Sequence, residues 1–265
     1  MTRRPTFLLS VLAFGFAFFY VPILSMIVYS FNASRLATVW GGFSTKWYVS
    51  LLSNQNVIEA LLLSLKIALV SATVATILGT MAAIGVVRFR FRGRGIFVAV
   101  AAMPLVIPYV VLAVAMLVMF SQFGIPLSLW TVGLGHVIIN IPLVLLIVAA
   151  RLIGMERNLE EAAMDLGSTY WGTLFRVTLP IAFPAMVAAF LTSFTTSFDE
   201  FALAFFLIGP QPTLPVYIYA QLRFPSRLPI VVTMAAVIMV ASVLMIVFSE
   251  YLRRAGENSS RPVES

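Results

Sequence analysis

Of the 265 residues, 61% are hydrophobic and only 10% are charged, whereas soluble domains carry about 25% charged residues, so a water-soluble protein is excluded. The formal charge of +7 does not indicate a nucleic-acid partner, because the Lys and Arg residues lie between apolar runs and not along one stripe. The chain has no cysteine, which excludes a disulfide framework and a thiolate metal site.

Apolar runs long enough to cross a bilayer follow one another along the chain. A helix needs about 20 mostly apolar residues to span the hydrocarbon. The predicted spans are about 7–31, 58–87, 96–120, 129–150, 181–208 and 229–252. The first run is too long for the apolar region of a secretion signal, so we expect it to be retained. The sequence thus predicts an all-α integral membrane protein with six transmembrane helices, in which residues 1–265 form a single domain.

Positive charges flank these spans unevenly. Because loops rich in Lys and Arg stay in the cytoplasm, the richer side, which holds both termini, is expected to be cytoplasmic. The richer side carries Arg3, Arg4, Arg88, Arg90, Arg92, Arg94, Arg151, Arg157, Arg176, Arg253, Arg254 and Arg261. The poorer side carries Arg35, Lys46, Arg223 and Arg227.

Smaller features along the spans predict packing. In the outer segment 32–57, the rings of Trp40, Trp47 and Tyr48 suit the bilayer interface. Small residues in the second span form a face that lets another helix approach closely. They are Ala68, Ala72, Ala75, Gly79, Ala82 and Ala83. In the third and fourth spans, three prolines are expected to kink helices: Pro104, Pro108 and Pro142.

The loop 151–180 is polar enough to leave the bilayer but is patterned like a helix. Asn158 followed by Glu161 forms a capping box before a short apolar stripe. Gly167 can take the positive φ of a helix stop, and the Ser-Thr pair after it can cap a second helix. A simple linker is the alternative, but a linker needs no apolar stripe facing away from its own bundle. The pattern predicts a cytoplasmic helix-turn-helix that acts as a docking surface.

The same loop resembles the E-A-A loop of ABC importer permeases. Glu161-Ala162-Ala163, then Gly167, then nine intervening residues and Val177-x-Leu179-Pro180 follow that motif, with Val in place of the usual Ile. In that family the loop is a coupling helix that seats in a groove of the ATP-hydrolysing subunit. The resemblance implies that role for residues 160–167, through Glu160, Glu161, Ala162, Ala163, Asp165 and Gly167.

The resemblance extends over nearly the whole chain, to the second permease of spermidine/putrescine-type importers. The matching segments are Ser30-Phe31-Asn32, Gly42-Phe43-Ser44 with Trp47-Tyr48, the Arg-rich turn 88–94, His136 with Pro142, and the segment 197–201. The chain has no G-x-x-x-x-G-K-[ST] motif. We therefore expect it to bind no cofactor, with ATP and Mg²⁺ held by a dimer of partner ABC ATPase subunits. The resemblance further implies a second, non-identical permease and a periplasmic or lipid-anchored solute-binding protein, in a bacterial inner membrane.

The fifth predicted span has a polar and an aromatic face. On a helical wheel, Thr192, Thr195, Thr196 and Asp199 form one stripe, with Ser193, Ser197 and Glu200 beside it. Phe190, Phe194, Phe198, Phe201 and Phe205 occupy the opposite arc. Two carboxylates at membrane depth are costly unless they are paired or solvated, and a pathway for a cationic solute explains them. In the alternative, they pair with Arg or Lys66 or cap the amides of a broken helix.

The sequence departs from the pattern of polyamine permeases at one position that bears on the substrate. Polyamine members of the family often carry an acidic residue directly after the proline of the third span, where this sequence has Tyr109. Tyr109 is therefore assigned to the pathway, and a zwitterion such as an amino acid derivative or opine stays open beside a polyamine. Lys66, His136 and Asn140 are expected to snorkel or pack and not to bind substrate.

Two other classes of function are alternatives to an importer subunit. An ion-coupled secondary transporter would also carry an intramembrane acidic pair, but it has no use for a docking loop, and the two halves of the chain show no internal repeat. A membrane-embedded enzyme would need a catalytic constellation, and the single His136 has no acidic neighbour in sequence. The sequence therefore predicts a transport subunit that is not itself an enzyme.

Overall fold

The computed structural model describes residues 6–36, 39–156 and 158–258, and side chains in 7–36, 39–156 and 158–251. In these ranges the chain is almost entirely helical, and the one β-type pairing is an isolated bridge between Asn32 and Phe43. The prediction of an all-α protein is confirmed. Among the arginines used for orientation, those outside the described residues or side chains are Arg3, Arg4, Arg157, Arg253, Arg254 and Arg261.

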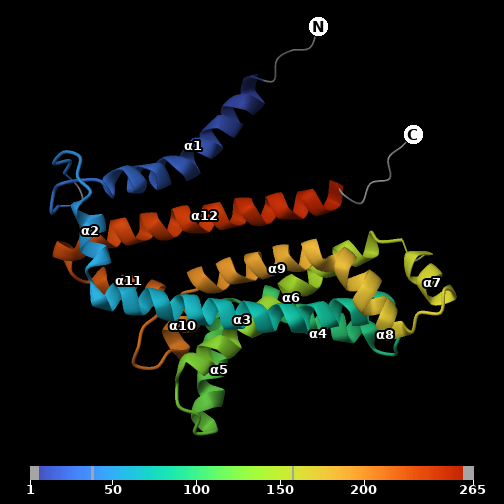
Figure 1. Cartoon of the computed structure of the whole chain (residues 1–265). Helices are drawn as coiled ribbons and strands as arrows, with labels where there is room; N and C mark the ends of the chain where they lie inside the picture. The colour runs from blue at the N-terminus through green and yellow to red at the C-terminus, as the bar shows by residue number, and fades with distance from the viewer. Residues whose placement is uncertain (1–5, 37–38, 157, 259–265) are drawn as a thin grey trace. The chain divides into compact units, whose positions relative to one another are not determined.

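Within the described residues, five helices are long and apolar enough to cross a membrane, and a bent pair makes a sixth if its two halves form one span. The long helices are α1 (Thr6–Tyr29), α3 (Gln55–Arg88), α6 (Leu129–Ile153), α9 (Leu179–Asp199) with the turns that precede it, and α12 (Leu228–Asn258). The positions of α1, α3, α6 and α12 agree with predicted spans, and α9 overlaps the first part of the predicted span 181–208 (Figure 1).

The predicted third span is broken. Helices α4 (Arg94–Val106) and α5 (Tyr109–Gln122) meet at an angle of 104° (Figure 1). Ile107 has extended backbone with φ −73° and ψ 128°, as expected of a residue that precedes a proline, and Pro108 then starts the next helix. The prediction of one helix over 96–120 is wrong, because Pro108 turns the chain instead of only kinking it.

The predicted fifth span is also shorter than expected. Helix α9 ends at Asp199, Glu200 is extended with ψ 120°, and the short helix α10 (Ala202–Leu207) follows. A single helix over 181–208 is therefore wrong, and the helical wheel holds only as far as Asp199. Phe201 and Phe205, which it placed on the aromatic face of this helix, belong to the break and to α10.

The chain forms two compact units, Met1–Glu59 with Tyr217–Val240, and Ala60–Val216 with Ala241–Ser265. In the first unit, the loop after α1 is organised by buried Asn32, whose Oδ1 accepts from the backbone N of Ser34 and of Gly41 at 3.0 and 2.8 Å. The indole of Trp47 donates to the Asn32 carbonyl at 2.8 Å. This loop leads into α2 (Lys46–Leu52), and the same unit contains most of α11 (Leu214–Gln221) and the turn Pro225–Arg227.

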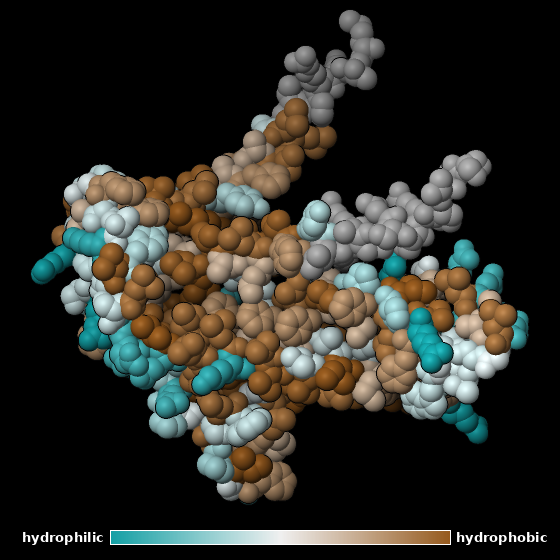
Figure 2. Space-filling view, viewed as in Figure 1, coloured by the Kyte–Doolittle hydropathy of each residue, from teal (hydrophilic) through white to brown (hydrophobic). Residues whose placement is uncertain are grey.

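The second unit is built around α6, which packs against α4, α9 and α10. The small-residue face of α3 lets that helix approach α6 closely: a Cβ on Gly79 would lie 2.5 Å from the Cβ of Val144. Ala68, Ala72, Ala75 and Ala83 are fully buried, so the packing prediction is confirmed. Many large apolar side chains nevertheless stay exposed, and hydrophobic residues cover the visible sides of the long helices (Figure 2). Lipid is the solvent that suits such a surface.

Candidate functional site

The connection between α6 and α9 folds into two short helices. Helix α7 (Asn158–Asp165) begins at Asn158 itself, and the chain turns at Gly167 with φ +89°. Thr169 caps α8 (Tyr170–Thr173), its Oγ1 accepting from the Gly172 backbone N at 3.1 Å. A π-helical turn, Leu174–Thr178, then leads into α9. The structure thus contains the two helices and the positive-φ turn that the sequence predicted.

Helix α7 presents its surface outward. Among the described side chains none on α7 is buried, and Leu159, Met164 and Leu166 are all exposed, Leu166 at 90%. In Figure 2, hydrophilic and hydrophobic residues lie side by side at the α7 end of the second unit. An exposed apolar stripe next to polar residues is typical of a protein interaction site.

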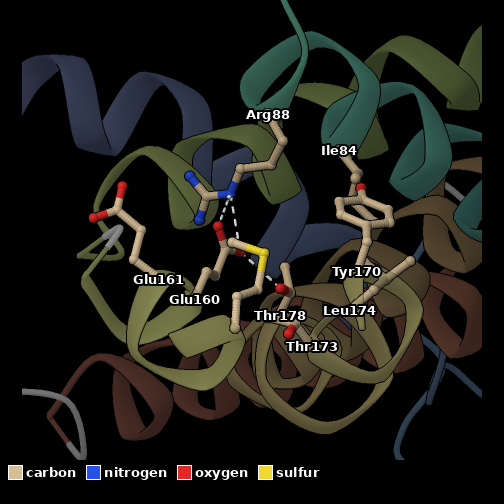
Figure 3. Close-up of a pocket in the computed structure, with 9 residues that line it drawn as sticks. Ile84, Arg88, Glu160, Glu161, Tyr170, Thr173, Leu174 and Thr178 are labelled. Atoms are coloured by element: carbon tan, nitrogen blue, oxygen red, sulfur yellow. Dashed lines mark hydrogen bonds and ion pairs between the residues drawn. The ribbon is translucent and has the colours of Figure 1, made fainter. Parts of the chain in front are cut away.

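The two glutamates of α7 differ in orientation. Glu160 is turned toward Arg88, at the end of α3, and toward Thr178, whereas Glu161 is turned away (Figure 3). Arg88 Nε lies 3.0 Å from both carboxylate oxygens of Glu160, and the Thr178 hydroxyl donates to Oε1 at 2.7 Å. The side chains of Arg88 and Glu160 are only 9% and 14% exposed. We call these three residues the α7 node.

A pocket of about 180 Å³ adjoins the node. It is lined by Ile84, Arg88, Glu160, Glu161, Met164, Tyr170, Thr173, Leu174 and Thr178 (Figure 3). In the described part of the chain, the Nη2 of Arg88 and the hydroxyl of Thr173 are buried without a hydrogen-bond partner. The pocket thus lies among side chains of α3, α7, α8 and the π-helical turn, and the polar contacts of Glu160 reach Arg88 and Thr178 in the same region.

The predicted polar stripe of α9 faces α12. Thr192 Oγ1 lies 3.3 Å from Ser249 Oγ, and Thr195 Oγ1 lies 3.9 Å from Met245 Sδ. Each stripe threonine also donates to the carbonyl four residues earlier, at 2.8 to 2.9 Å for Thr192, Thr195 and Thr196. Their hydroxyls are thus satisfied within α9, as is common for Thr in transmembrane helices.

The two acidic residues at the end of α9 have different surroundings. Asp199 is exposed, and its Oδ2 accepts a hydrogen bond from Ser242 Oγ at 2.6 Å. Glu200 is buried at 7% and accepts from the backbone N of Leu203 at 2.9 Å and of Ala204 at 3.1 Å. Glu200 therefore caps α10, which is the role that the alternative interpretation gave to the pair.

Glu200 also belongs to a buried polar cluster. His136 Nε2 lies 3.4 Å from Glu200 Oε2, and His136 Nδ1 lies 2.5 Å from Ser197 Oγ. Ser197 in turn lies 2.8 Å from Ser71 Oγ on α3. The cluster connects α3, α6 and the end of α9. The sequence placed His136 in packing but missed its acidic neighbour, because the break after Asp199 brings Glu200 back toward α6.

Several residues of the site carry little or no signal in the sequence. Tyr109, expected in the pathway, starts α5 and packs against the apolar cluster that contains Met116 and Leu207. The sequence marks Arg88 as a topogenic charge and as part of the Arg-rich turn 88–94 but gives it no partner, and Thr178 and Ser242 stand in runs where nothing distinguishes them. Arg88 is the last residue of the 34-residue helix α3. Its place at the expected cytoplasmic end of a predicted span is the signal in the sequence that could have suggested a contact with the docking loop.

The sequence is similar to a known protein family and to individual transport proteins. Residues 75–255 match the family described as binding-protein-dependent transport system inner membrane component. The spermidine/putrescine transport system permease protein PotC of Escherichia coli (strain K12) is 36% identical over 240 residues, which cover 90% of each chain. The putrescine transport system permease protein PotI of the same organism is 41% identical over 221 residues, 80% of this chain and 79% of PotI.

The fold agrees with a solved transporter. A chain of a bacterial ABC transporter involved in the import of the acidic polysaccharide alginate superposes with a TM-score of 0.72 and 16% identity, covering 94% of both chains. At that identity the likeness concerns the fold alone. With the family match and the two relatives, the chain belongs to the family of binding-protein-dependent transport system inner membrane components, as a membrane-spanning permease subunit of an ABC importer.

Proposed function

We propose that this permease forms part of the pathway for a polyamine or a related small organic cation, and that a dimer of partner ATPase subunits binds ATP and Mg²⁺ to drive import. PotC and PotI, whose names specify spermidine and putrescine, support this substrate class. A second, non-identical permease and a periplasmic or lipid-anchored solute-binding protein complete the assembly. The uneven distribution of arginines supports cytoplasmic termini in a bacterial inner membrane.

The exposed carboxylate of Asp199 is the observation that carries the substrate class. It stands at the last residue of α9, where the negative end of the helix dipole disfavours an anion and favours a cation. Its one described hydrogen bond comes from Ser242, a neutral hydroxyl, so the negative charge is not neutralised by that contact. An ammonium group passing this point would be attracted by both the carboxylate and the helix end.

The exposed apolar stripe of α7 supports the ATPase partner. A short helix that buries none of its described side chains within its own chain gains little from intrachain packing. Leu159 and Leu166 would leave water if they entered a groove on another subunit. Glu160, Glu161, Ala162, Ala163, Asp165 and Gly167 are the coupling residues of this proposal.

Reconstitution tests the proposed function. The chain, its ATPase, the second permease and the solute-binding protein are placed in proteoliposomes, and uptake of labelled putrescine, spermidine and a zwitterionic amino acid derivative is measured with and without ATP. We expect ATP-dependent uptake of the two polyamines. Uptake of the zwitterion alone would contradict the substrate class, and uptake driven by an ion gradient without ATP would indicate a secondary transporter.

A further inference from the structure

Helix α7 has few ways to transmit force to the rest of the chain. Leu159 and Met164 are exposed, and a pocket of about 180 Å³ is lined by Met164 together with Ile84 and Leu174. Tight apolar packing transmits displacement because interiors are dense, and empty space between side chains weakens that transmission. In addition, the carboxylate of Glu160 makes direct polar contacts to Arg88 at the end of α3 and to Thr178 just before α9.

The geometry of Glu160 suits a firm connection. Its carboxylate contacts a guanidinium at the end of α3 and a hydroxyl at the start of α9, so one side chain holds two long helices. Both members of the ion pair are shielded from water, at 9% and 14% exposure. Charge-assisted hydrogen bonds are about twice as strong as neutral ones, and shielding from solvent limits screening by salt.

Helix α9 can carry displacement from this point to the proposed pathway. Thr178 immediately precedes α9, and Asp199 is its last residue. At about 1.5 Å per residue, the 21 residues of α9 extend about 30 Å. The π-helical turn that ends at Thr178 brings its hydroxyl to Glu160, and such turns are frequent at functional sites.

We propose that the α7 node, Arg88, Glu160 and Thr178, is the joint through which movement of α7 is transmitted to α3 and α9. The inference rests on the proposed function, because it requires a partner ATPase that moves α7. Glu160, Arg88 and Thr178 are positioning residues: they act through the long helices and touch neither ATP nor solute. Without the node, the ATPase would still bind the apolar stripe and hydrolyse ATP, but hydrolysis would be uncoupled from import.

The test measures import per ATP hydrolysed in the complete reconstituted transporter, with putrescine as the probe. Thr178→Val removes one hydroxyl with little change of shape, and Glu160→Gln removes the charge. For assembled complexes, each compared with its own rate of ATP hydrolysis, we expect the import-to-hydrolysis ratio to be lowered about 3-fold by Thr178→Val and at least about 10-fold by Glu160→Gln. Arg88→Glu combined with Glu160→Arg restores the pair and should recover most of the ratio.

Glu156→Gln is the matched control, because Glu156 is exposed and lies just before α7, so the same chemical change leaves the ratio at the wild-type value. An unchanged ratio in Glu160→Gln and Thr178→Val would overturn the node. Failure of both variants to assemble with the ATPase would also overturn it, since it would show a structural role. A wild-type complex that hydrolyses ATP but imports neither polyamine would overturn the proposed substrate class. A wild-type complex that neither hydrolyses ATP nor imports a polyamine would overturn both the proposed function and the role of the α7 node.

Discussion

Asp199 and Glu200 are neighbours in sequence, yet Asp199 is exposed at the end of α9 whereas Glu200 is buried and caps α10. The extended backbone of Glu200 separates the two side chains. On a continuous helix they would stand about 100° apart and share one polar region. Because of the break, the Glu200 carboxylate accepts from backbone amides, whereas the Asp199 carboxylate accepts from the Ser242 hydroxyl. Substitutions of the two residues should therefore have different consequences.

Asp199→Asn should impair import while leaving the protein folded. The amide keeps an oxygen that can accept from Ser242, but it removes the negative charge proposed to attract a cation. Import of putrescine should fall at least about 10-fold, equivalent to about 1.4 kcal/mol, at an unchanged midpoint of thermal unfolding. Uptake assays on the purified, reconstituted complex check this. A well-assembled variant with wild-type uptake would exclude Asp199 from the pathway.

Glu200→Gln should impair folding first. The amide replaces a charged acceptor of the Leu203 and Ala204 amides and removes the negative charge that lies 3.4 Å from His136 Nε2. Weakening these buried contacts should lower the free energy of unfolding by about 1–3 kcal/mol. Thermal unfolding in detergent measures the effect, with Glu59→Gln as the control because Glu59 is exposed. Unchanged stability together with lost import would instead indicate that Glu200 meets the solute.

The sequence was most informative where local chemistry decides the structure. Apolar run length placed the long helices, and Gly167 was identified as a turn because a positive φ favours glycine. The two broken spans could not be located in the same way, since Pro108 predicts a kink but not a 104° bend. The α7 node and the His136 to Glu200 contact join residues 72 and 64 positions apart, and single-sequence periodicity carries no such information.

Gly79→Ala should destabilise the contact between α3 and α6. A Cβ at this position would lie 2.5 Å from Val144 Cβ and 3.0 Å from the Ile141 carbonyl oxygen, so the helices would have to separate. Overpacking of this kind costs about 1–3 kcal/mol. Gly85→Ala is the matched control on the same helix, because nothing lies within 4 Å of its added Cβ. Equal unfolding midpoints for the two variants would contradict close packing at Gly79.

Topology reporters should verify the predicted orientation. A reporter fused after Arg94 should be active in the cytoplasm, and one fused near Ser53 should be active outside, because the arginine-rich turn 88–94 is expected to stay in the cytoplasm. Reporter activity in intact cells measures both positions. A cytoplasmic reporter at Ser53 would reverse the orientation and place α7 on the side where no ATPase is available.

Gly167→Val should prevent docking of the ATPase. Gly167 has φ +89°, a backbone conformation that is strained for a β-branched residue, at a cost of about 1–3 kcal/mol. Nothing lies within 4 Å of an added Cβ, so the effect must come from the backbone and not from a clash. Gly167→Asn distinguishes backbone strain from the mere addition of a side chain, because asparagine tolerates positive φ better than valine does. The asparagine variant should retain most of its binding to the ATPase. We expect the valine variant to insert in the membrane, to bind the ATPase weakly in a pull-down from detergent, and to lose solute-stimulated ATP hydrolysis. Wild-type stimulation in the valine variant would show that the turn between α7 and α8 has no part in coupling.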